Sequence, residues 1–466
     1  MSTRSLATQR VGVEIAGQNL ANVNNPAYAR QRVNIQTGIA VNSPFGPQGT
    51  GADVVSVQQI RSALVDQQIT GELGVSGYLQ AQKDALEYAQ ASLGEVLDRS
   101  TGSAEGAAAA GAGAQTGLAS ELNGLFAAFQ SVSTSPSSLT ERQLLLSKAQ
   151  DLATHFNQAS ERLTNLSGAL DKSLDADVTD ANQLLSDIAD LNDQIINTEN
   201  TTNGVANDLR DLRQSKLENL SKLVKVDATE AANGGLEISV NGTTLVSDRN
   251  VLDTLQTYDA GGGQMLVRTT ASATPLSLSG GHMQGVIDVR DGAIADLRGQ
   301  IDTLAGALIS EVNAAHSGGF ALNGATGVAF FNGTNAATIQ VNGSLVSDPS
   351  LLQVSGTAGN AGDNQVGLTM AQLANKRLPA LNNQTFSQSY GGTVAQLGQS
   401  LASVNGRAED QQVVEKMLLG HRESISGVSI DEEMSDLMKY QTAFEASARL
   451  ISVVDEMLDT LVNLKR

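Results

Sequence analysis

The sequence lacks cysteine altogether, and this excludes disulfide bonds, thiolate-based zinc sites and cysteine nucleophiles. It also lacks tryptophan, and aromatic residues make up only 3% of its 466 residues. The apolar cores must therefore be built from leucine, isoleucine, valine and alanine. Such cores suit close-packed helices better than a ligand pocket lined with aromatic rings.

Positive charge is scarce as well. The chain has 29 lysines and arginines against 49 aspartates and glutamates, a net charge of −20. A uniformly acidic chain repels phosphate backbones and anionic membrane surfaces, so we expect neither nucleic acid nor membrane as a partner. No apolar run approaches the roughly 20 residues that span a bilayer. Residues 1–21 are amphipathic and lack the apolar core and cleavage site of a secretory signal.

Motifs that carry chemistry are missing too. The four histidines, His155, His282, His316 and His421, are not spaced as metal ligands. The triple glycine at 261–263 does not belong to a phosphate-binding frame, and there is no G-x-S-x-G nucleophile elbow. We therefore expect no catalytic, cofactor or metal site, and a protein that is not an enzyme.

What the sequence does contain is an apolar stripe at each end. Residues recur at steps of three, four and seven, which puts them on one face of a helix that must pack against another helix. We expect the two terminal helices to form a coiled coil, with the second starting at a capping box of Ser429 and Glu432. The predicted assembly seam consists of Leu6, Val13, Ala16, Leu20, Val23, Ile430, Met434, Leu437, Phe444, Ile451, Val454, Leu458 and Leu461.

The two ends also differ in charge. Residues 1–36 contain four arginines and one glutamate, a net of +3, whereas residues 430–466 contain eight acids and four bases, a net of −4. Two hypotheses remain open. The charges either solvate the outer helix faces, or they favour pairing of one end with the other.

Further helical patterns fill the interior, and a glycine- and alanine-rich tract at residues 102–117 reads as a flexible connector. Strands are expected only around Asn241-Gly242 and Asn342-Gly343, because Asn-Gly between β-rich runs is a strong hairpin signal. The fold class is thus mainly α with a β-rich insertion, in an elongated multidomain chain. The predicted interior helices span residues 85–97, 117–132, 139–170, 174–195 and 286–316.

Residues 15–33 resemble the N-terminal signature of the axial proteins of the bacterial flagellum, which form its rod, hook and filament. The matching positions are Ala21, Asn22, Asn25, Pro26 and Tyr28. Pro26 cannot continue a helix and pushes Asn25 out of the α region. Ala27 stands where the family usually has glycine, so we expect the turn to avoid positive φ. The resemblance also leads us to expect a first helix that is a turn short, or a start upstream of Met1.

Internal segments narrow this resemblance to the hook-associated protein 1 family. The run Gly281 to Asp291 is similar to a G-x-x-x-G-L-L-D-F-R-D segment of that family. Residues 313–331, 347–352, 362–364, 422–433 and 439–464 resemble other segments of it.

The resemblance implies a structural subunit in a ring between hook and filament. It implies contacts with further copies, with the hook protein and with a second hook–filament junction protein. It also implies export by the flagellar type III apparatus without a cleaved signal, a cytoplasmic export chaperone on the C-terminal helix, and a final place on the extracellular flagellum.

The layered fold of the family implies three domains in this chain. These are a terminal coiled-coil domain of residues 1–60 with 428–466, a helical middle domain of residues 61–225 with 363–427, and a β-rich insertion of residues 226–362 that includes helix 286–316. Two alternatives stay open: another axial protein, such as a hook protein or a flagellin, and a cytoplasmic helical scaffold.

Overall fold

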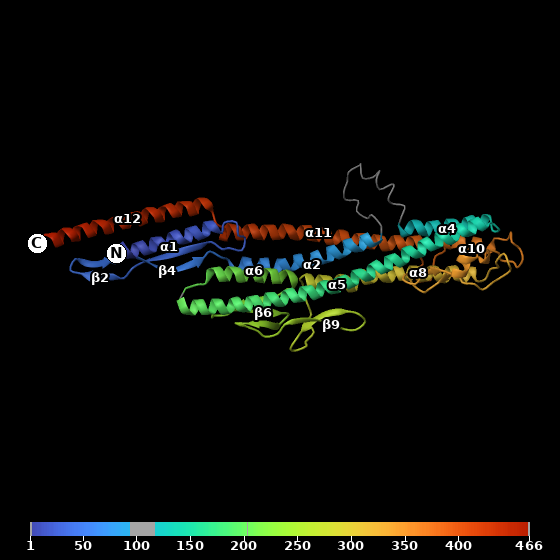
Figure 1. The fold of residues 1–466 in the computed structure, drawn as a ribbon, viewed down its shortest axis with the longest axis horizontal. Helices are drawn as coiled ribbons and strands as arrows, with labels where there is room; N and C mark the ends of the chain where they lie inside the picture. Colours follow the sequence, from blue (N-terminus) through green and yellow to red (C-terminus); the bar gives the residue numbers. More distant parts are fainter. Residues whose placement is uncertain (1, 94–116, 203, 465–466) are drawn as a thin grey trace.

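The computed structural model describes residues 2–93, 117–202 and 204–464, and the predicted connector at 102–117 lies almost wholly outside them. The fold is mainly helical with small antiparallel sheets, as the sequence predicts. The molecule is elongated, and both ends of the chain lie at one pole (Figure 1). None of the described helices has the length and apolar character needed to cross a bilayer.

The terminal pole has three layers. Helix α1 (Ser2–Ala21) lies between the antiparallel helix α12 (Ile430–Asn463) and a β-ribbon (Figure 1). The ribbon pairs β1 (Gln31–Thr37) with β4 (Ala52–Gln59), and a hairpin of β2 (Ala40–Ser43) and β3 (Gly46–Gly49) continues it.

The prediction that strands occur only around the two Asn-Gly pairs is therefore wrong. Strand β1 buries only Gln31 and Val33, and its remaining residues are exposed. A strand with so few buried positions leaves little alternation of apolar and polar residues in the sequence, and that alternation is the signal from which strands are predicted.

The body of the molecule is a bundle of long helices. Helix α5 (Leu139–Thr202) joins two separately predicted stripes into one rod of 64 residues, about 96 Å long at 1.5 Å per residue. One continuous apolar core runs along it and includes Phe129, Phe156 and Phe330 towards the far pole. The other helices of the body are α2 (Ala63–Leu93), α4 (Leu118–Thr134), α6 (Asn207–Leu223), α7 (His282–Val289), α8 (Ala295–His316), α10 (Gln365–Gln372) and α11 (Phe386–Ser426).

Helices α7 and α8 form a single rod that contains one π-helical turn, Arg290–Ile294. The predicted helix at residues 286–316 is thus present and begins one turn earlier. The buried Arg290 side chain donates to Asp171 of α5 at 2.6 Å and to Asp291 at 2.7 Å, which fixes the turn against the bundle. Short 3₁₀ turns occur at Pro349–Leu351, Leu373–Asn375 and Pro379–Leu381.

The first predicted hairpin is confirmed. Asn241 and Gly242 both have positive φ, of 48° and 82°, and connect the second and third strands of a four-stranded sheet. Asn192 of α5 binds the sheet by donating to the Leu236 carbonyl at 2.9 Å. The strands of this β region are β5 (Asp227–Glu230), β6 (Leu236–Val240), β7 (Thr243–Ser247), β8 (Asn250–Val251) and the separate pair β9 (Leu255–Asp259) with β10 (Met265–Thr269).

The second predicted hairpin is wrong. The Asn342 side chain accepts a hydrogen bond from the Ser344 amide at 3.1 Å and caps the short helix α9 (Gly343–Ser347). Strand β12 (Gln340–Val341) instead pairs backwards with β11 (Phe331–Asn332). Asparagine serves equally well in a turn and as a helix cap, so the same letters produce two structures.

Candidate functional site: the terminal helix pair and its joint

Helices α1 and α12 meet through small and polar residues spaced by seven. Ser5 and Ser447 share a hydrogen bond of 3.1 Å, and the Asn19 amide donates to Glu433 at 2.9 Å. Midway between them, Gly12 lies under the Tyr440 ring, which would be 2.6 Å from any Cβ at that position. The pairing of the terminal helices predicted from the heptads is thus present, and the pair is antiparallel. Its contact line consists of polar and small residues together with the Tyr440 ring.

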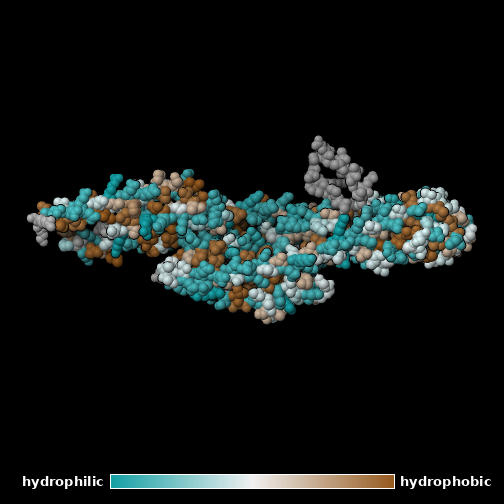
Figure 2. All heavy atoms as spheres, viewed as in Figure 1, coloured by the Kyte–Doolittle hydropathy of each residue, from teal (hydrophilic) through white to brown (hydrophobic). Residues whose placement is uncertain are grey.

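The predicted apolar seam lies beside this line. On α1, Ala16 is buried, and Leu6, Val13, Leu20 and Val23 are half-buried. On α12, most of the stripe faces solvent, although Leu437 and Ile451 are half-buried. Figure 2 shows hydrophobic residues along the surface of this pole. The exposed members of the predicted stripe are Ile430, Met434, Phe444, Val454, Leu458 and Leu461, of which Leu461 is 67% exposed.

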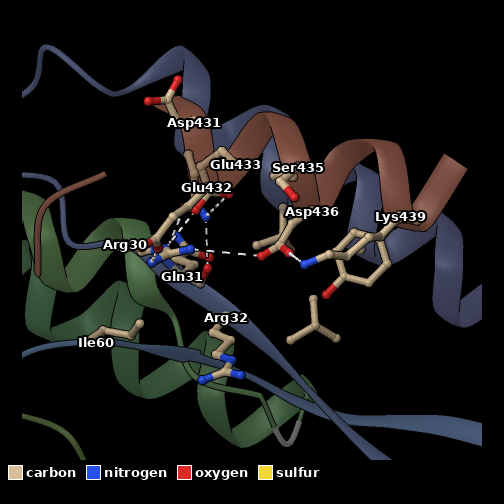
Figure 3. Close-up of a pocket in the computed structure, with 16 residues that line it drawn as sticks. Arg30, Gln31, Arg32, Ile60, Asp431, Glu432, Glu433, Ser435, Asp436 and Lys439 are labelled. Atoms are coloured by element: carbon tan, nitrogen blue, oxygen red, sulfur yellow. Dashed lines mark hydrogen bonds and ion pairs between the residues drawn. The ribbon is translucent and has the colours of Figure 1, made fainter. Parts of the chain in front are cut away.

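Arg30 fastens the start of α12. Its guanidinium donates to Glu433 at 2.7 Å and to Glu432 at 2.5 Å, and lies 3.9 Å from Asp436 (Figure 3). Its backbone amide donates to the carbonyl of Ser426, the last residue of α11, at 2.9 Å. Arg30 therefore holds both sides of the break between α11 and α12. Burial lowers the pKa of Arg30, but the hydrogen bond to Glu432 and the charge of Glu433 outweigh it, so the net shift is upward.

The predicted capping box at the start of α12 is wrong. Ser429 occupies the N-cap position, but its side chain makes no capping hydrogen bond. Glu432, the other member of the predicted box, is bound to Arg30 instead. In the pair with Arg30 both partners carry a charge, whereas a backbone amide would offer the Glu432 carboxylate only a neutral donor, and this explains the difference.

The axial-family motif builds the turn that delivers Arg30. The Tyr28 hydroxyl donates to the Asn19 side-chain oxygen at 2.8 Å, and the Asn19 amide donates to the Gln31 carbonyl at 2.9 Å. The Ala27 amide donates to the Asn25 side chain at 3.1 Å, and Ala27 is absent from the described residues with positive φ, as expected. Burial and the nearby acids raise the pKa of Tyr28, which therefore stays a proton donor at neutral pH.

The remaining motif residues lie on this turn as well. Helix α1 ends at Ala21, and the Asn22 amide still donates to the Gln18 carbonyl at 3.1 Å. The backbone carbonyl of Asn25 accepts a hydrogen bond from the Tyr28 amide at 3.1 Å, and Pro26 between them is exposed.

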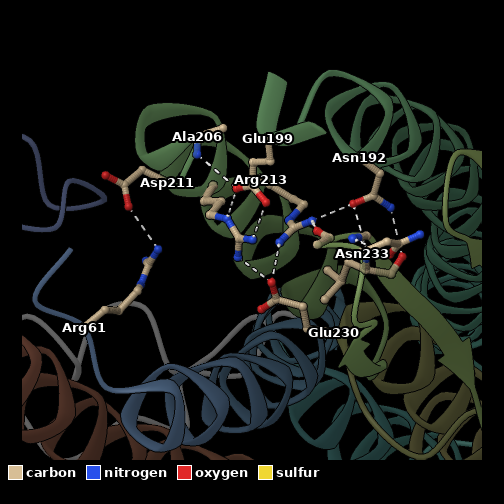
Figure 4. A network of polar contacts seen from close by, with 12 residues as sticks. Arg61, Asn192, Glu199, Ala206, Asp211, Arg213, Glu230 and Asn233 are labelled. Carbon is tan, nitrogen blue, oxygen red and sulfur yellow. Dashed lines mark hydrogen bonds and ion pairs between the residues drawn. The ribbon is translucent and has the colours of Figure 1, made fainter. Parts of the chain in front are cut away.

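A second joint ties the same turn to the helical body. The carboxylate of Asp211 on α6 accepts from the Ala29 amide at 3.1 Å and from Arg61 at 2.9 Å (Figure 4). Arg61 also donates to Asp66 of α2 at 2.6 Å. Burial raises the pKa of Asp211 to about 6, against which the Ala29 amide and Arg61 act. The terminal pole is therefore held by buried charges rather than by a flexible linker.

The arginines near the N-terminus make local ion pairs. Arg4 lies 3.3 Å from Asp53 of β4, and Arg10 lies 3.5 Å from Glu14 of its own helix. Among the described residues, Arg30 is the N-terminal arginine that forms ion pairs with the acidic side chains of α12.

Sequence reasoning missed Asn19, Arg30, Asp211 and Glu433 as the residues of the joint. Their partners lie up to 414 residues away, a separation at which local periodicity carries no information. The one local signal for the joint is the density of polar residues around Pro26, which exceeds what the end of a helix needs. Among the described residues, no group of three or more histidine, cysteine or acidic side chains could hold a metal ion.

Comparison with known proteins agrees with this architecture. Residues 107–331 match the helical domain of the flagellar hook-associated protein FlgK, and residues 422–464 match the C-terminal domain of the flagellar basal body rod proteins FlgEFG. The chain is 26% identical to flagellar hook-associated protein 1 of Bacillus subtilis, covering 99% of this chain and 96% of that protein. It is 21% identical to the protein of the same name in Escherichia coli, covering 99% and 98%.

A solved structure shares the fold. The flagellar hook junction protein FlgK from Burkholderia pseudomallei superimposes with a TM-score of 0.64 at 14% identity, covering 77% of this chain and all of that one. The helical-domain match, the rod-type C-terminal match and the nearly full-length likeness to hook-associated proteins agree with one another. The chain therefore resembles flagellar hook-associated protein 1 (FlgK) over nearly its whole length.

Proposed function

We propose that this protein is a structural subunit at the junction between the hook and the filament of the bacterial flagellum. The observation that carries the proposal is the paired terminal helices, whose α12 member presents an apolar stripe to solvent in the single chain. An exposed stripe of this extent marks an interaction surface. The names of the relatives, hook-associated protein 1 and hook junction protein, point to the same place.

The assembly we propose is a ring of identical copies whose terminal helices are covered by neighbouring subunits. The hook protein would contact one side of the ring, and a second hook–filament junction protein the other. The lack of cysteine is compatible with export as an unfolded chain through the flagellar type III apparatus, followed by refolding outside the cell. Before export, a cytoplasmic chaperone would cover the apolar stripe of α12. The protein would then reside on the extracellular flagellum.

The predicted domain division becomes part of this proposal. It comprises a terminal domain of residues 1–60 with 428–466 and a helical middle domain of residues 61–225 with 363–427. In the third part, residues 226–362, strands β5–β10 lie against α5, whereas α7 packs on both α2 and α5. Separate expression of residues 61–427 tests whether the body folds without the terminal pole.

Electron microscopy of a strain that lacks the gene tests the function directly. We expect hooks without filaments, flagellin shed into the medium, and recovery of filaments when the gene is restored. Normal filaments in the deletion strain would contradict the proposal. A deletion that also removes the hook would favour the alternative of a hook or rod protein. Retention of the protein in the cytoplasm of a fully flagellated cell would favour the scaffold alternative.

A further inference from the structure

The β2–β3 hairpin projects from the terminal pole with apolar residues on its surface. Ile39 is 80% exposed and Val41 58% exposed, and Phe45 at the tip is exposed as well. The base is well fixed, because Gly38 donates to the Gly51 carbonyl at 2.7 Å and Thr50 donates to the Ile39 carbonyl at 2.7 Å. A two-stranded hairpin is marginal in water unless a surface supports it. This hairpin is therefore built to pack against something that the single chain does not supply.

Charge restricts what that surface can be. Residues 38–52 contain no charged side chain, in a chain whose net charge is −20. The exposed apolar residues of α12 are interspersed with acids, including Glu445, Asp455 and Glu456. An uncharged apolar hairpin can approach this acidic helix without like-charge repulsion, whereas most of the remaining surface of this chain cannot.

The two surfaces lie on opposite sides of one pole. Helix α1 separates α12 from the β-ribbon that carries the hairpin, so the hairpin and α12 of one chain are on different faces (Figure 1). The apolar stripe of α12 is already exposed at Ile430 and Met434, in the part of the helix that packs beside α1. It stays exposed as far as Leu461. Two complementary surfaces on opposite sides of a subunit produce a head-to-tail contact, which repeats around a ring or along a helical row.

We propose that the β2–β3 hairpin of one copy docks on the exposed apolar stripe of α12 in the next copy. Ile39 and Val41 are the contacting residues on the hairpin, and they pack on one short stretch of the helix. Met438, Met457 and Leu461 are exposed positions that sample the stripe from its start to its end. This contact rests on the proposed function, since it names the interface through which neighbouring junction subunits join. It also gives the row a direction, because hairpin and helix are different surfaces.

The absence of native cysteine allows a clean cross-linking test in the full-length chain. One preparation carries Ile39→Cys, and a second carries Met438→Cys, Met457→Cys or Leu461→Cys. The two are mixed, added to isolated hooks and treated with a short bis-maleimide. A matched control replaces the α12 variant by Val413→Cys, whose position on α11 is 67% exposed, as Leu461 is.

We expect covalent dimers of this chain from at least one α12 variant in the assembled state, and none from the Val413→Cys control. Wild-type protein that joins hooks while no α12 variant yields a dimer overturns the hairpin contact and leaves the proposed function intact. Equal yields from the control, or a cross-link to the hook protein alone, overturn it as well. Failure of wild-type protein to join hooks at all counts against the proposed function instead.

Discussion

Arg30→Met removes the guanidinium that binds the start of α12. It keeps an unbranched apolar side chain in place of the aliphatic part of the arginine. The Glu433 side chain is only 4% exposed, so in this variant its carboxylate loses the Arg30 partner and keeps only the Asn19 amide. Removing one partner of a buried ion pair costs about 3–5 kcal/mol. Arg30 itself is 20% exposed, and water can replace part of its role, so we take the lower end, about 3 kcal/mol.

Hydrogen exchange of the monomer measures this loss locally. In the wild-type chain we expect slow exchange at residues 430–440 and fast exchange at residues 450–463, where α12 is exposed on most sides. A loss of about 3 kcal/mol corresponds to an acceleration of roughly 150-fold at residues 430–440, since about 1.4 kcal/mol is a factor of ten. Exchange in the core of α5 should not change.

Two controls make the reasoning refutable. Arg32→Met changes an exposed arginine on β1, two residues after Arg30, and should leave exchange at residues 430–440 within a few-fold of wild type. Adding Glu433→Gln to Arg30→Met should restore part of the protection, because it removes the unpaired buried charge. If Arg30→Met and Arg32→Met have the same effect, Arg30 does not hold the joint.

Three further predictions concern assembly, packing and pH. Leu458→Asp should abolish incorporation on isolated hooks while the circular dichroism of the helical body stays unchanged; normal filaments would show that Leu458 lies outside the subunit interface. Gly12→Leu should separate α1 from α12, because its Cβ would lie 2.6 Å from the Tyr440 ring, and exchange in α1 should accelerate by at least tenfold, whereas Gly17→Leu, at an open position, should have little effect. The pKa of Asp211 is raised from 3.8 to about 6, so its charged form destabilises the folded state. This loss of stability is small at pH 4, grows as the pH rises, and is complete above pH 6. The wild type should therefore lose stability relative to Asp211→Asn as the pH rises from 4 to 7 in urea unfolding, and parallel pH profiles would contradict the assignment.

The sequence was sufficient for the long helices and for their pairing at the ends. Leucines and isoleucines at helical spacing locate α5 and α12. The stripe of α5 is buried within the chain, and that of α12 is exposed in the single chain. The same periodicity cannot say which neighbour buries a stripe. It therefore led to an apolar α1–α12 seam, whereas Gly12 and Tyr440 lie on the actual contact line.

Other features depend on partners that are distant in the chain. The spacing of Ser429 and Glu432 predicts a capping box, but the role of Glu432 depends on Arg30, 402 residues earlier. The Asn-Gly pair predicts a turn at Asn342, but the choice between a turn and a helix cap depends on whether a helix follows. Strand β1 escaped notice because only its first residues are buried. For Glu432 and Asn342 the local signal is present in the sequence, and the surrounding structure decides its meaning.

Analysis of purified flagella tests the central claim most directly. Flagella sheared from cells would be imaged by cryo-electron microscopy at the hook–filament junction, and their protein content determined by peptide mass spectrometry. The account predicts this chain in the preparation, and a layer of elongated subunits between hook and filament in which the terminal helices of adjacent copies are in contact. Absence of the chain from intact flagella, or its presence along the whole hook or filament, would contradict the account.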